Sequence, residues 1–287
     1  MIPLRPTQGY HMERYRDTAS AAPTPSPLRE KTSTPSEKEV CLFLAEYGAW
    51  LLGCGATCIR LEKNVQRMAE TYGKKVELTI TPRHIHVSVL DVLNSETVTT
   101  IASVKAIPVS FNLNTLLSQL SWEVADRRLG FDAARERFHS IIHSDSQSRW
   151  TVLLLVTLAN ASFCRLFGGD LWAMAIVGIA TLAGYYLKQV LLANKVDIRV
   201  VVLACAFVSS VLGASCQLFS LGDTPAVATA TSILYLVPGI PFLNSFSDML
   251  YRYYICSFSR FMDAVVLTAS LSIGLCAGMA LMKVGMF

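Results

Sequence analysis

The second half of this chain is divided into long stretches without a single charged residue, and this feature constrains the fold more than any other. After Arg149 the uncharged intervals cover residues 150–164, 171–187, 200–222, 224–247 and 264–282. A membrane-spanning helix needs about 20 mainly apolar residues, within a range of roughly 17–25, and four intervals meet this length directly. The first interval is shorter, but Arg165 can snorkel to the membrane surface and Leu166 extends the apolar end. We therefore predict five spans, over residues 150–167, 171–190, 200–221, 226–246 and 263–283.

The first half of the chain has the opposite character. Residues 1–150 hold 18 of the 25 Lys and Arg residues and 16 of the 21 Asp and Glu residues. Residues 1–36 are rich in Pro, Ser and Thr and lack the apolar segment of a signal peptide. We expect this segment to be a disordered tail, and the part of the chain before the first span to stay in the cytoplasm.

The polar segment between the tail and the first span predicts a small α+β domain. Ser36 to Glu39 reads as a capping box that starts a helix ending near Gly53, and a second helix runs from about Thr57 to a stop at Gly73. Strands are predicted at residues 76–81, 84–90 and 98–104, followed by helices at 114–129 and 132–143. The predicted fold class is a bundle of about five transmembrane helices preceded by this α+β cytoplasmic domain. Its parts are the tail, residues 1–36, the soluble domain, residues 37–146, and the transmembrane domain, residues 147–287.

The charges between the spans predict the orientation in the membrane. Loops that face the cytoplasm carry an excess of Lys and Arg. If the soluble domain is cytoplasmic, the outer segments carry only Arg165 and Lys283, whereas the inner ones carry Lys188, Lys195, Arg199, Arg252 and Arg260. This count favours a multi-pass protein of the inner (plasma) membrane with its N-terminus inside and its C-terminus outside.

The fourth predicted span contains two prolines. Pro238 and Pro241 deprive the carbonyl groups of Leu234 and Val237 of their usual helical donors. Within the hydrocarbon region such backbone is tolerated only where it is buried in protein or faces water. Many transporters use broken helices of this kind to present backbone polar groups to a substrate or ion.

Polar side chains follow the break at helical spacing. Asn244, Asp248 and Arg252 are four residues apart, so a continuing helix would place an amide, a carboxylate and a guanidinium on one stripe. Asp248 could pair with Arg252, or it could carry a coupling proton or cation. The alternative is that this segment is only the interfacial end of a span, with Tyr251, Tyr253 and Tyr254 as an aromatic belt.

Two pairs of small residues occur within the predicted spans. Gly274 and Gly278 in the last span, and Ala180 and Gly184 in the second, have the small-x3-small spacing that lets helices approach closely. We expect them to pack helices within the chain, with the interface of a homo-oligomer as the second reading.

No pattern for catalysis, cofactor binding or nucleic-acid binding stands out. Cys54 and Cys58 are closely spaced, but no second pair completes a zinc site, and we expect packed, reduced thiols. A site shared by two histidine pairs is the weaker alternative to histidines that are merely exposed; these pairs are His84 with His86 and His139 with His143. We find no nucleophile elbow, phosphate-binding glycine loop or HExxH motif, so we predict neither an enzyme nor a resident metal or cofactor.

Two segments resemble a known family. Residues 48–62, Gly-Ala-Trp-Leu-Leu-Gly-Cys-Gly-Ala-Thr-Cys-Ile-Arg-Leu-Glu, are similar to the opening motif of the threonine/serine exporter (ThrE-type) family, and residues 236–248 resemble its membrane signature more closely. The first motif is matched by Gly55, Ala56, Arg60 and Glu62, and the second by Pro238, Gly239, Pro241, Asn244 and Asp248.

The resemblance implies a secondary exporter of small hydrophilic metabolites. Five spans correspond to one half of the fused members of that family, which suggests the larger subunit of its split form, working with a smaller membrane subunit. The split form is associated with succinate, so the implied cargo is threonine, serine or a dicarboxylate, with H⁺ as the expected coupling ion. Arg252 or Arg60 could attract the substrate carboxylate.

Two further function classes remain as alternatives at this point. One is a membrane-anchored regulator or sensor, in which the α+β domain binds a ligand and the spans only anchor it. The other, weaker one is a membrane-bound hydrolase, for which the sequence offers no nucleophile constellation.

Overall fold

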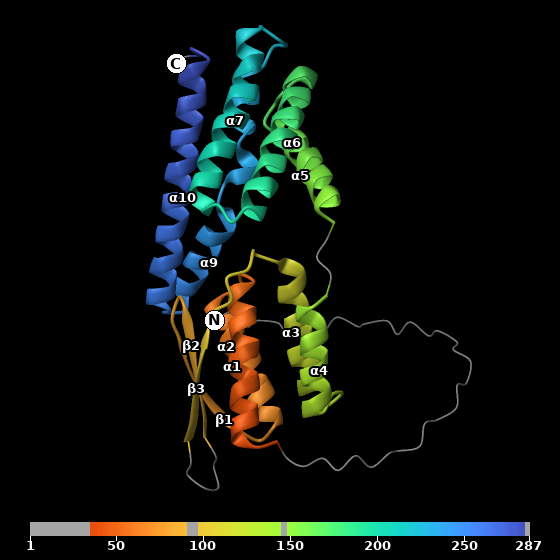
Figure 1. Ribbon diagram of the computed structural model, residues 1–287, viewed down its shortest axis with the longest axis vertical. Coiled ribbons are helices and arrows are strands. Elements are labelled where there is room, and N and C mark those ends of the chain that lie inside the picture. The colour runs from red at the N-terminus through yellow and green to blue at the C-terminus, as the bar shows by residue number, and fades with distance from the viewer. Residues whose placement is uncertain (1–34, 91–96, 145–147, 285–287) are drawn as a thin grey trace, which may run out of the picture. The chain divides into compact units, whose positions relative to one another are not determined.

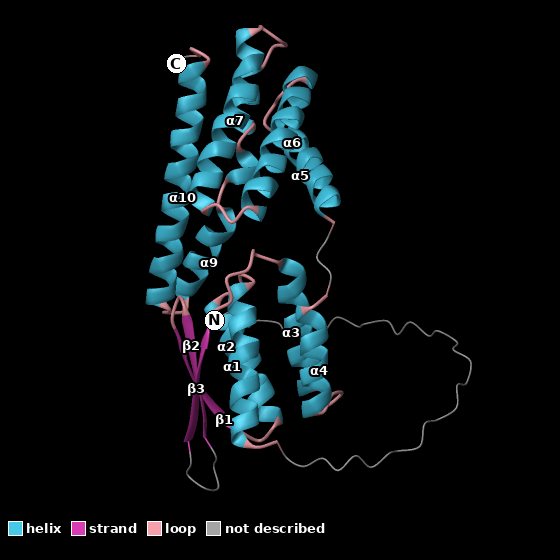
Figure 2. Ribbon diagram, in the orientation of Figure 1, coloured by secondary structure: helices cyan, strands magenta, loops and turns pink. Residues whose placement is uncertain are grey.

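The computed structural model describes residues 35–90, 97–144 and 148–284, which form helices and one small sheet (Figures 1 and 2). Residues 1–34 of the predicted tail at 1–36, the predicted turn at Asn94 and Ser95 and the predicted domain boundary at 146/147 lie outside the described residues. The elements before the first predicted span are α1 (Glu37–Gly53), α2 (Cys58–Thr71), β1 (Lys75–Ile80), β2 (His84–Leu90), β3 (Thr97–Ser103), α3 (Phe111–Ala125) and α4 (Phe131–Ile142).

The start of α1 and the end of α2 follow the local sequence rules. Ser36 caps α1 by accepting a hydrogen bond from the backbone of Glu39, and the Glu39 side chain accepts one from the backbone N–H of Ser36 at 3.0 Å, as the capping box predicts. After α2, Gly73 adopts a φ of +67°, a conformation that glycine reaches without steric cost. Thr57, which precedes α2, makes no side-chain cap.

The sheet is an antiparallel meander of three strands in the order β1-β2-β3. Its central strand pairs Val87 with Leu78 on one side and with Thr100 on the other. Ile85, Val87 and Val89 alternate along β2 and are fully buried, because this face of the sheet packs against α1. Each strand begins and ends within one residue of its predicted bounds.

The helices α1 to α4 share one hydrophobic core with this sheet face. Tyr47 lies at its centre, fully buried, and its hydroxyl donates to the carbonyl of Leu117 at 2.8 Å and accepts from the Asn64 amide at 3.1 Å. Burial raises the pKa of Tyr47 well above its ordinary value, so the phenol stays protonated. The network ties α1, α2 and α3 together by a buried polar contact whose groups are satisfied.

The second half of the chain is helical and apolar. Its elements are α5 (Arg149–Leu166), α6 (Leu171–Ala193), α7 (Ile198–Leu218), α8 (Pro225–Thr231), the short 3₁₀ helix η1 (Leu234–Leu236), α9 (Gly239–Leu250) and α10 (Tyr254–Leu281). Within the described residues, α6, α7 and α10 are long and apolar enough to cross a membrane. The bent pair formed by α8–η1 and α9 gives a fourth candidate if it is counted as one span. Helix α5 lies where the first span is predicted, and the count of five stays a prediction.

The apolar helices pack in the order α5, α6, α7 and α10, with α9 against α10 (Figure 1). Glycines allow the closest approaches. A Cβ at Gly278 of α10 would lie 1.8 Å from Ser210 Oγ of α7, and one at Gly184 of α6 would lie 2.3 Å from Ser209 Oγ. The predicted small-residue pairs thus pack helices against each other within the chain.

Candidate functional site

The fourth predicted span is broken where the two prolines stand. The segments α8–η1 and α9 meet at an angle of 59°. Val237, the residue before Pro238, is extended, since proline disfavours the helical conformation in its predecessor. The carbonyls of Leu234 and Val237 lack their helical donors, as predicted, but they accept local hydrogen bonds from the N–H groups of Val237, at 3.2 Å, and Gly239, at 2.9 Å. Neither carbonyl is therefore left unsatisfied for a substrate.

Asp248, near the end of α9, is completely buried and caps a helix far away in the sequence. Its Oδ1 accepts a hydrogen bond from the backbone N–H of Cys58 at 2.8 Å. Cys58 is the first residue of α2, whose own N-cap residue, Thr57, makes no such bond. The first N–H groups of a helix have no intrahelical partner and carry partial positive charge, so a carboxylate is stabilised there.

Arg260 supplies the second positive group. Its Nη1 lies 3.1 Å from Asp248 Oδ2, and its Nη2 donates to the carbonyl of Ala56 at 2.8 Å. Within the described residues, neither Asp248 Oδ2 nor Arg260 Nη1 forms a hydrogen bond of suitable geometry. The contact between these two atoms is therefore an ion pair without a hydrogen bond. The buried carboxylate is thus held between a helix N-terminus and a guanidinium group.

The predicted stripe from Asp248 to Arg252 is wrong. Helix α9 ends at Leu250, and Arg252 is exposed with a φ of +66° in a tight turn, where the N–H of Tyr253 donates to the carbonyl of Asp248 at 2.8 Å. Arg252 therefore points away from the stripe, and Arg260 of α10 takes the place expected for it.

Arg260 was not among the predicted site residues, because its position between two predicted spans marks it as a loop charge. Helix α10 begins at Tyr254, ahead of the uncharged interval, and has 28 residues, which corresponds to about 42 Å. The hydrocarbon core of a membrane is only about 30 Å thick. The sequence does contain a signal for this early helix start. No proline or glycine occurs between Tyr254 and Asp263, so the helix can begin before the apolar run.

One further contact joins the two segments that carry the family resemblance, and a second one joins the first segment to the turn after α9. Asn244 Nδ2 donates to the carbonyl of Gly55 at 2.9 Å, and the hydroxyl of Tyr253 donates to Glu62. Gly55 has a φ of +95°, and a Cβ there would lie 2.9 Å from a methyl group of Val109, so only glycine fits this turn. Burial and the Glu62 carboxylate raise the pKa of Tyr253.

Residues 55–62 and 244–260 are called the motif junction below. Of the predicted site residues, it brings together Gly55, Ala56 and Glu62 with Asn244 and Asp248. Pro238, Gly239 and Pro241 shape the break before it. Arg60 lies outside these contacts and donates to Asn114 Oδ1 at 2.9 Å.

The environment of Cys54 and Cys58, at the α2 side of the junction, favours their protonated thiol form. A hydrogen bond with Cys256, followed by burial, raises the pKa of Cys58, and burial raises that of Cys54 to about 11. The thiolate is the form that binds metal ions. The described part of the chain contains no group of three or more His, Cys, Asp or Glu side chains that could hold a metal ion.

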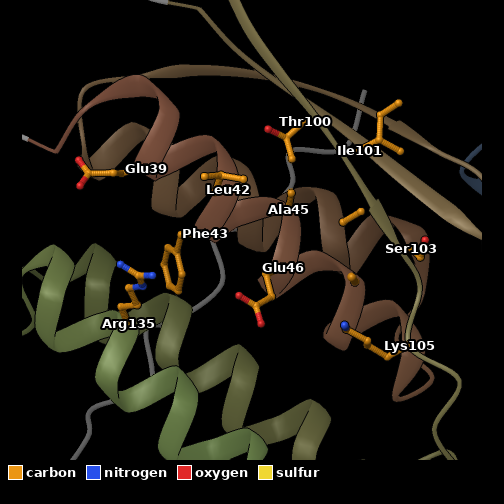
Figure 3. Close-up of a pocket in the computed structure, with 12 residues that line it drawn as sticks. Glu39, Leu42, Phe43, Ala45, Glu46, Thr100, Ile101, Ser103, Lys105 and Arg135 are labelled. Carbon is orange, nitrogen blue, oxygen red and sulfur yellow. The ribbon is translucent and has the colours of Figure 1, made fainter.

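Two of the pockets in the described structure are lined by residues of α1–α4, and they differ in charge. The first, of about 570 Å³, lies between α1, β3 and α4 and is called the mixed-charge pocket; Figure 3 shows the side chains that line it, among them Glu39, Glu46, Lys105 and Arg135. The second, of about 490 Å³, is called the basic pocket and touches the motif junction; it is lined by Thr57, Ile59, Arg60, Lys63, Asn64, Arg67, Ser118, Trp122, Ser247 and Tyr251.

Several apolar helices, a proline-broken helix and a buried, ion-paired carboxylate near the end of that helix are features typical of membrane transporters. The chain belongs to the family described as "Putative threonine/serine exporter", whose sequence model matches residues 42–282. It is therefore a member of a family of membrane exporters, and the resemblance seen in its two motifs is confirmed.

Two curated relatives align over most of their length. A protein of Klebsiella aerogenes named "Probable succinate transporter subunit YjjP" is 25% identical over 254 residues, which cover 88% of this chain and 96% of the relative. The protein of the same name from Escherichia coli K12 is 25% identical over 243 residues, 84% of this chain and 94% of the relative. No solved structure matches the chain.

Proposed function

We propose that this protein is the larger subunit of a two-chain secondary exporter that moves a small carboxylate-bearing metabolite out of the cell across the inner membrane. The observation that carries the proposal is the motif junction, where a broken apolar helix contacts the soluble elements through the buried Asp248. An element that only anchors a protein in lipid needs neither a proline break nor a buried ion pair. Both relatives are named as a transporter subunit, which supports a partner chain for this protein.

Asp248 is the first candidate for coupling transport to an H⁺ gradient. Its negative charge binds two positive groups at once, the N-terminus of α2 and Arg260. Protonation would cancel that charge and weaken both attachments together. The junction would then open, and α9 could move relative to α2. A proton taken up on one side of the membrane would thereby be linked to a change in the substrate path.

The proposal includes five spans with the soluble elements in the cytoplasm. Three of the five cations counted as inner loop charges lie inside helices, Lys188 in α6, Arg199 in the first turn of α7 and Arg260 in α10. The orientation therefore depends mainly on Lys195, Arg252 and, at the very start of its helix, Arg199. The count of Lys and Arg still favours a cytoplasmic N-terminus, because the outer segments carry only Arg165 and Lys283. Reporter fusions at the C-terminus that are active only outside the cytoplasm test it.

The cargo under this proposal is succinate or a similar dicarboxylate, with threonine and serine as the competing class. The relatives' names favour the dicarboxylate, and the family description favours the amino acids. All of these substrates carry a carboxylate, and a cation such as Arg60 suits that group in each case.

The direct test is efflux from cells loaded with labelled succinate, threonine or serine. The cells express this chain alone, the smaller membrane subunit alone, or both. We expect faster efflux of one cargo only when both chains are present. Unchanged efflux of every cargo, with both chains present in the membrane, would overturn the proposal.

A second candidate, a membrane-anchored sensor, is favoured by one observation, the mixed-charge pocket in the soluble elements (Figure 3). Glu39 of that pocket already serves the capping box of α1. The two candidates differ in their dependence on a partner. A smaller membrane protein that is stable only together with this chain supports the exporter, whereas stability and ligand binding of this chain alone, without transport, support the sensor.

A further inference from the structure

The basic pocket lies where the soluble elements meet the end of the broken helix. Thr57 and Arg60 come from the N-terminal end of α2, Ser118 from α3, and Ser247 and Tyr251 from the C-terminal end of α9 and the turn after it. Ser247 directly precedes Asp248, so a molecule in this pocket would lie beside the motif junction.

Three cations of α2 line one side of the pocket, and no acidic residue lines it. Arg60, Lys63 and Arg67 are three and four residues apart, which places them on one face of the helix. Within the described residues none of the three forms an ion pair. The mixed-charge pocket differs in this respect, because two carboxylates and two cations line it together.

The two guanidinium groups are held in place by neutral partners. Arg60 Nη1 donates to Asn114 Oδ1 at 2.9 Å. Arg67 Nη1 donates to Ser121 Oγ at 2.6 Å and to Asn64 Oδ1 at 3.0 Å, and its guanidinium carbon lies 3.6 Å from the centre of the Trp122 ring. These contacts fix the side chains without neutralising them, and each guanidinium has further N–H donors left for an anion.

We propose that the basic pocket is the cytoplasmic entry site of the exporter and binds a small molecule with two carboxylate groups and no ammonium group. The two carboxylates can each bind one of the three cations, and the hydroxyl groups of Ser247 and Tyr251 can donate further hydrogen bonds. An amino acid would bring its ammonium group among three cations with no carboxylate to receive it, which costs free energy. The pocket therefore selects against threonine and serine. This inference deepens the proposed function, since the role as an entry site depends on transport.

The test measures binding without transport. The purified full chain, together with its smaller subunit, is titrated by calorimetry with succinate, with threonine and with inorganic sulfate. The double variant Arg60→Gln/Lys63→Gln removes two of the cations. The control Lys75→Gln removes an exposed lysine of β1, outside the pocket. Thermal unfolding of each variant confirms that it is folded.

We expect succinate to bind the wild type and to lose affinity at least about tenfold in the double variant, the loss that one charge-assisted hydrogen bond accounts for. The control should bind as the wild type does. Threonine and sulfate should bind at least about tenfold more weakly than succinate.

Three results would overturn the site. These are equal succinate binding by the double variant, threonine binding as tight as succinate binding, and sulfate binding as tight as succinate binding, which would indicate a general anion patch. Efflux measured in parallel separates this inference from the proposed function. Binding with the expected pattern but without efflux contradicts only the exporter role, whereas efflux that the double variant leaves unchanged contradicts only the entry site.

Discussion

At the scale of single residues, Asp248 and Arg260 are the pair on which the account depends. A buried ion pair contributes little net stability, but removing one partner leaves an uncompensated buried charge. Asp248 has no exposed side-chain surface, whereas the side chain of Arg260 is 19% exposed. The cost of a substitution should therefore appear mainly when the arginine, and not the aspartate, is neutralised.

We predict that Arg260→Gln lowers the free energy of unfolding by up to about 3–5 kcal/mol, because it leaves the Asp248 carboxylate buried without its cation. Arg252→Gln is the matched control, because Arg252 is exposed and forms no ion pair among the described residues. Thermal unfolding in detergent compares the two variants. Equal melting temperatures would show that Arg260 does not stabilise the carboxylate.

Two glycines in the apolar helices provide a second comparison at this scale. A Cβ at Gly278 would meet Ser210 Oγ at 1.8 Å and the carbonyl of Phe207 at 2.9 Å, whereas one at Gly178 would meet nothing within 4 Å. Gly278→Ala should therefore lower stability by about 1–3 kcal/mol, the usual cost of overpacking. Gly178→Ala should be neutral or stabilising by up to about 1 kcal/mol. A loss of stability in Gly178→Ala, with none in Gly278→Ala, would contradict the contact between α7 and α10.

The residues of the candidate site were partly predictable from the sequence. Asp248 stands out as a carboxylate at the end of an apolar run that contains two prolines. Its two partners could not be predicted in this way, because Cys58 and Arg260 are 190 and 12 residues away in the sequence. Only the tertiary structure brings a backbone N–H and a guanidinium to the same carboxylate. Arg252 was the wrong choice because helical spacing applies only while the helix continues, and α9 ends at Leu250.

At the scale of elements, the break before α9 positions the motif junction. Pro241 lies in the first turn of α9, where a helix tolerates proline, and Pro238 precedes the helix. We predict that the double variant Pro238→Ala/Pro241→Ala allows α8, η1 and α9 to straighten and draws Asn244 away from Gly55. Efflux by the two-chain system should then fall at least about tenfold, whereas Pro241→Ala alone should keep most of it.

The contact between Asn244 and Gly55 can be tested separately from the break. Asn244→Ala removes the hydrogen bond to Gly55 and leaves both prolines in place, so it should lower efflux as the double variant does. Full efflux in the double variant would show that the break is not required.

Glu37, in the first turn of α1, should make the stability of the folded protein depend on pH. A hydrogen bond from Lys74 lowers the pKa of Glu37 below its ordinary value. Because the folded pKa is the lower one, the carboxylate contributes stability that is fully present above the unfolded pKa, about 4.3, and is lost as the pH falls through the folded pKa. Glu37→Gln and Lys74→Gln should each flatten the fall in melting temperature between about pH 6 and pH 3. An equally steep fall in wild type and Glu37→Gln would contradict this role.

Most elements could be placed from the sequence because their signals are local. The capping box at Ser36, the glycine at 73 and the alternation in β2 each depend on a few neighbouring residues, and the structure has them as predicted. The bend at Pro238 was predictable, but its consequences were not. Whether the freed carbonyls face a substrate or accept local hydrogen bonds depends on the path of the chain after Val237, which no local rule determines.

At the scale of the whole molecule, we propose a polar part that binds an anion and a membrane part that moves it. The joint is the buried Asp248, which caps α2 and pairs with Arg260. The apolar intervals were visible in the sequence, but the contact between two segments about 190 residues apart was not. The family resemblance came from these two segments, and the structure shows that they are in contact.

The measurement that tests the central claim most directly uses proteoliposomes containing this chain and its smaller subunit, with an imposed pH gradient. Labelled succinate is followed in the wild type and in Asp248→Asn, whose side-chain oxygen can still cap α2 while the negative charge is gone. We predict that the wild type accumulates succinate against its gradient. The variant should lose this accumulation at least about tenfold but keep exchange of succinate for succinate. Gradient-driven accumulation at the wild-type rate in Asp248→Asn would contradict the account.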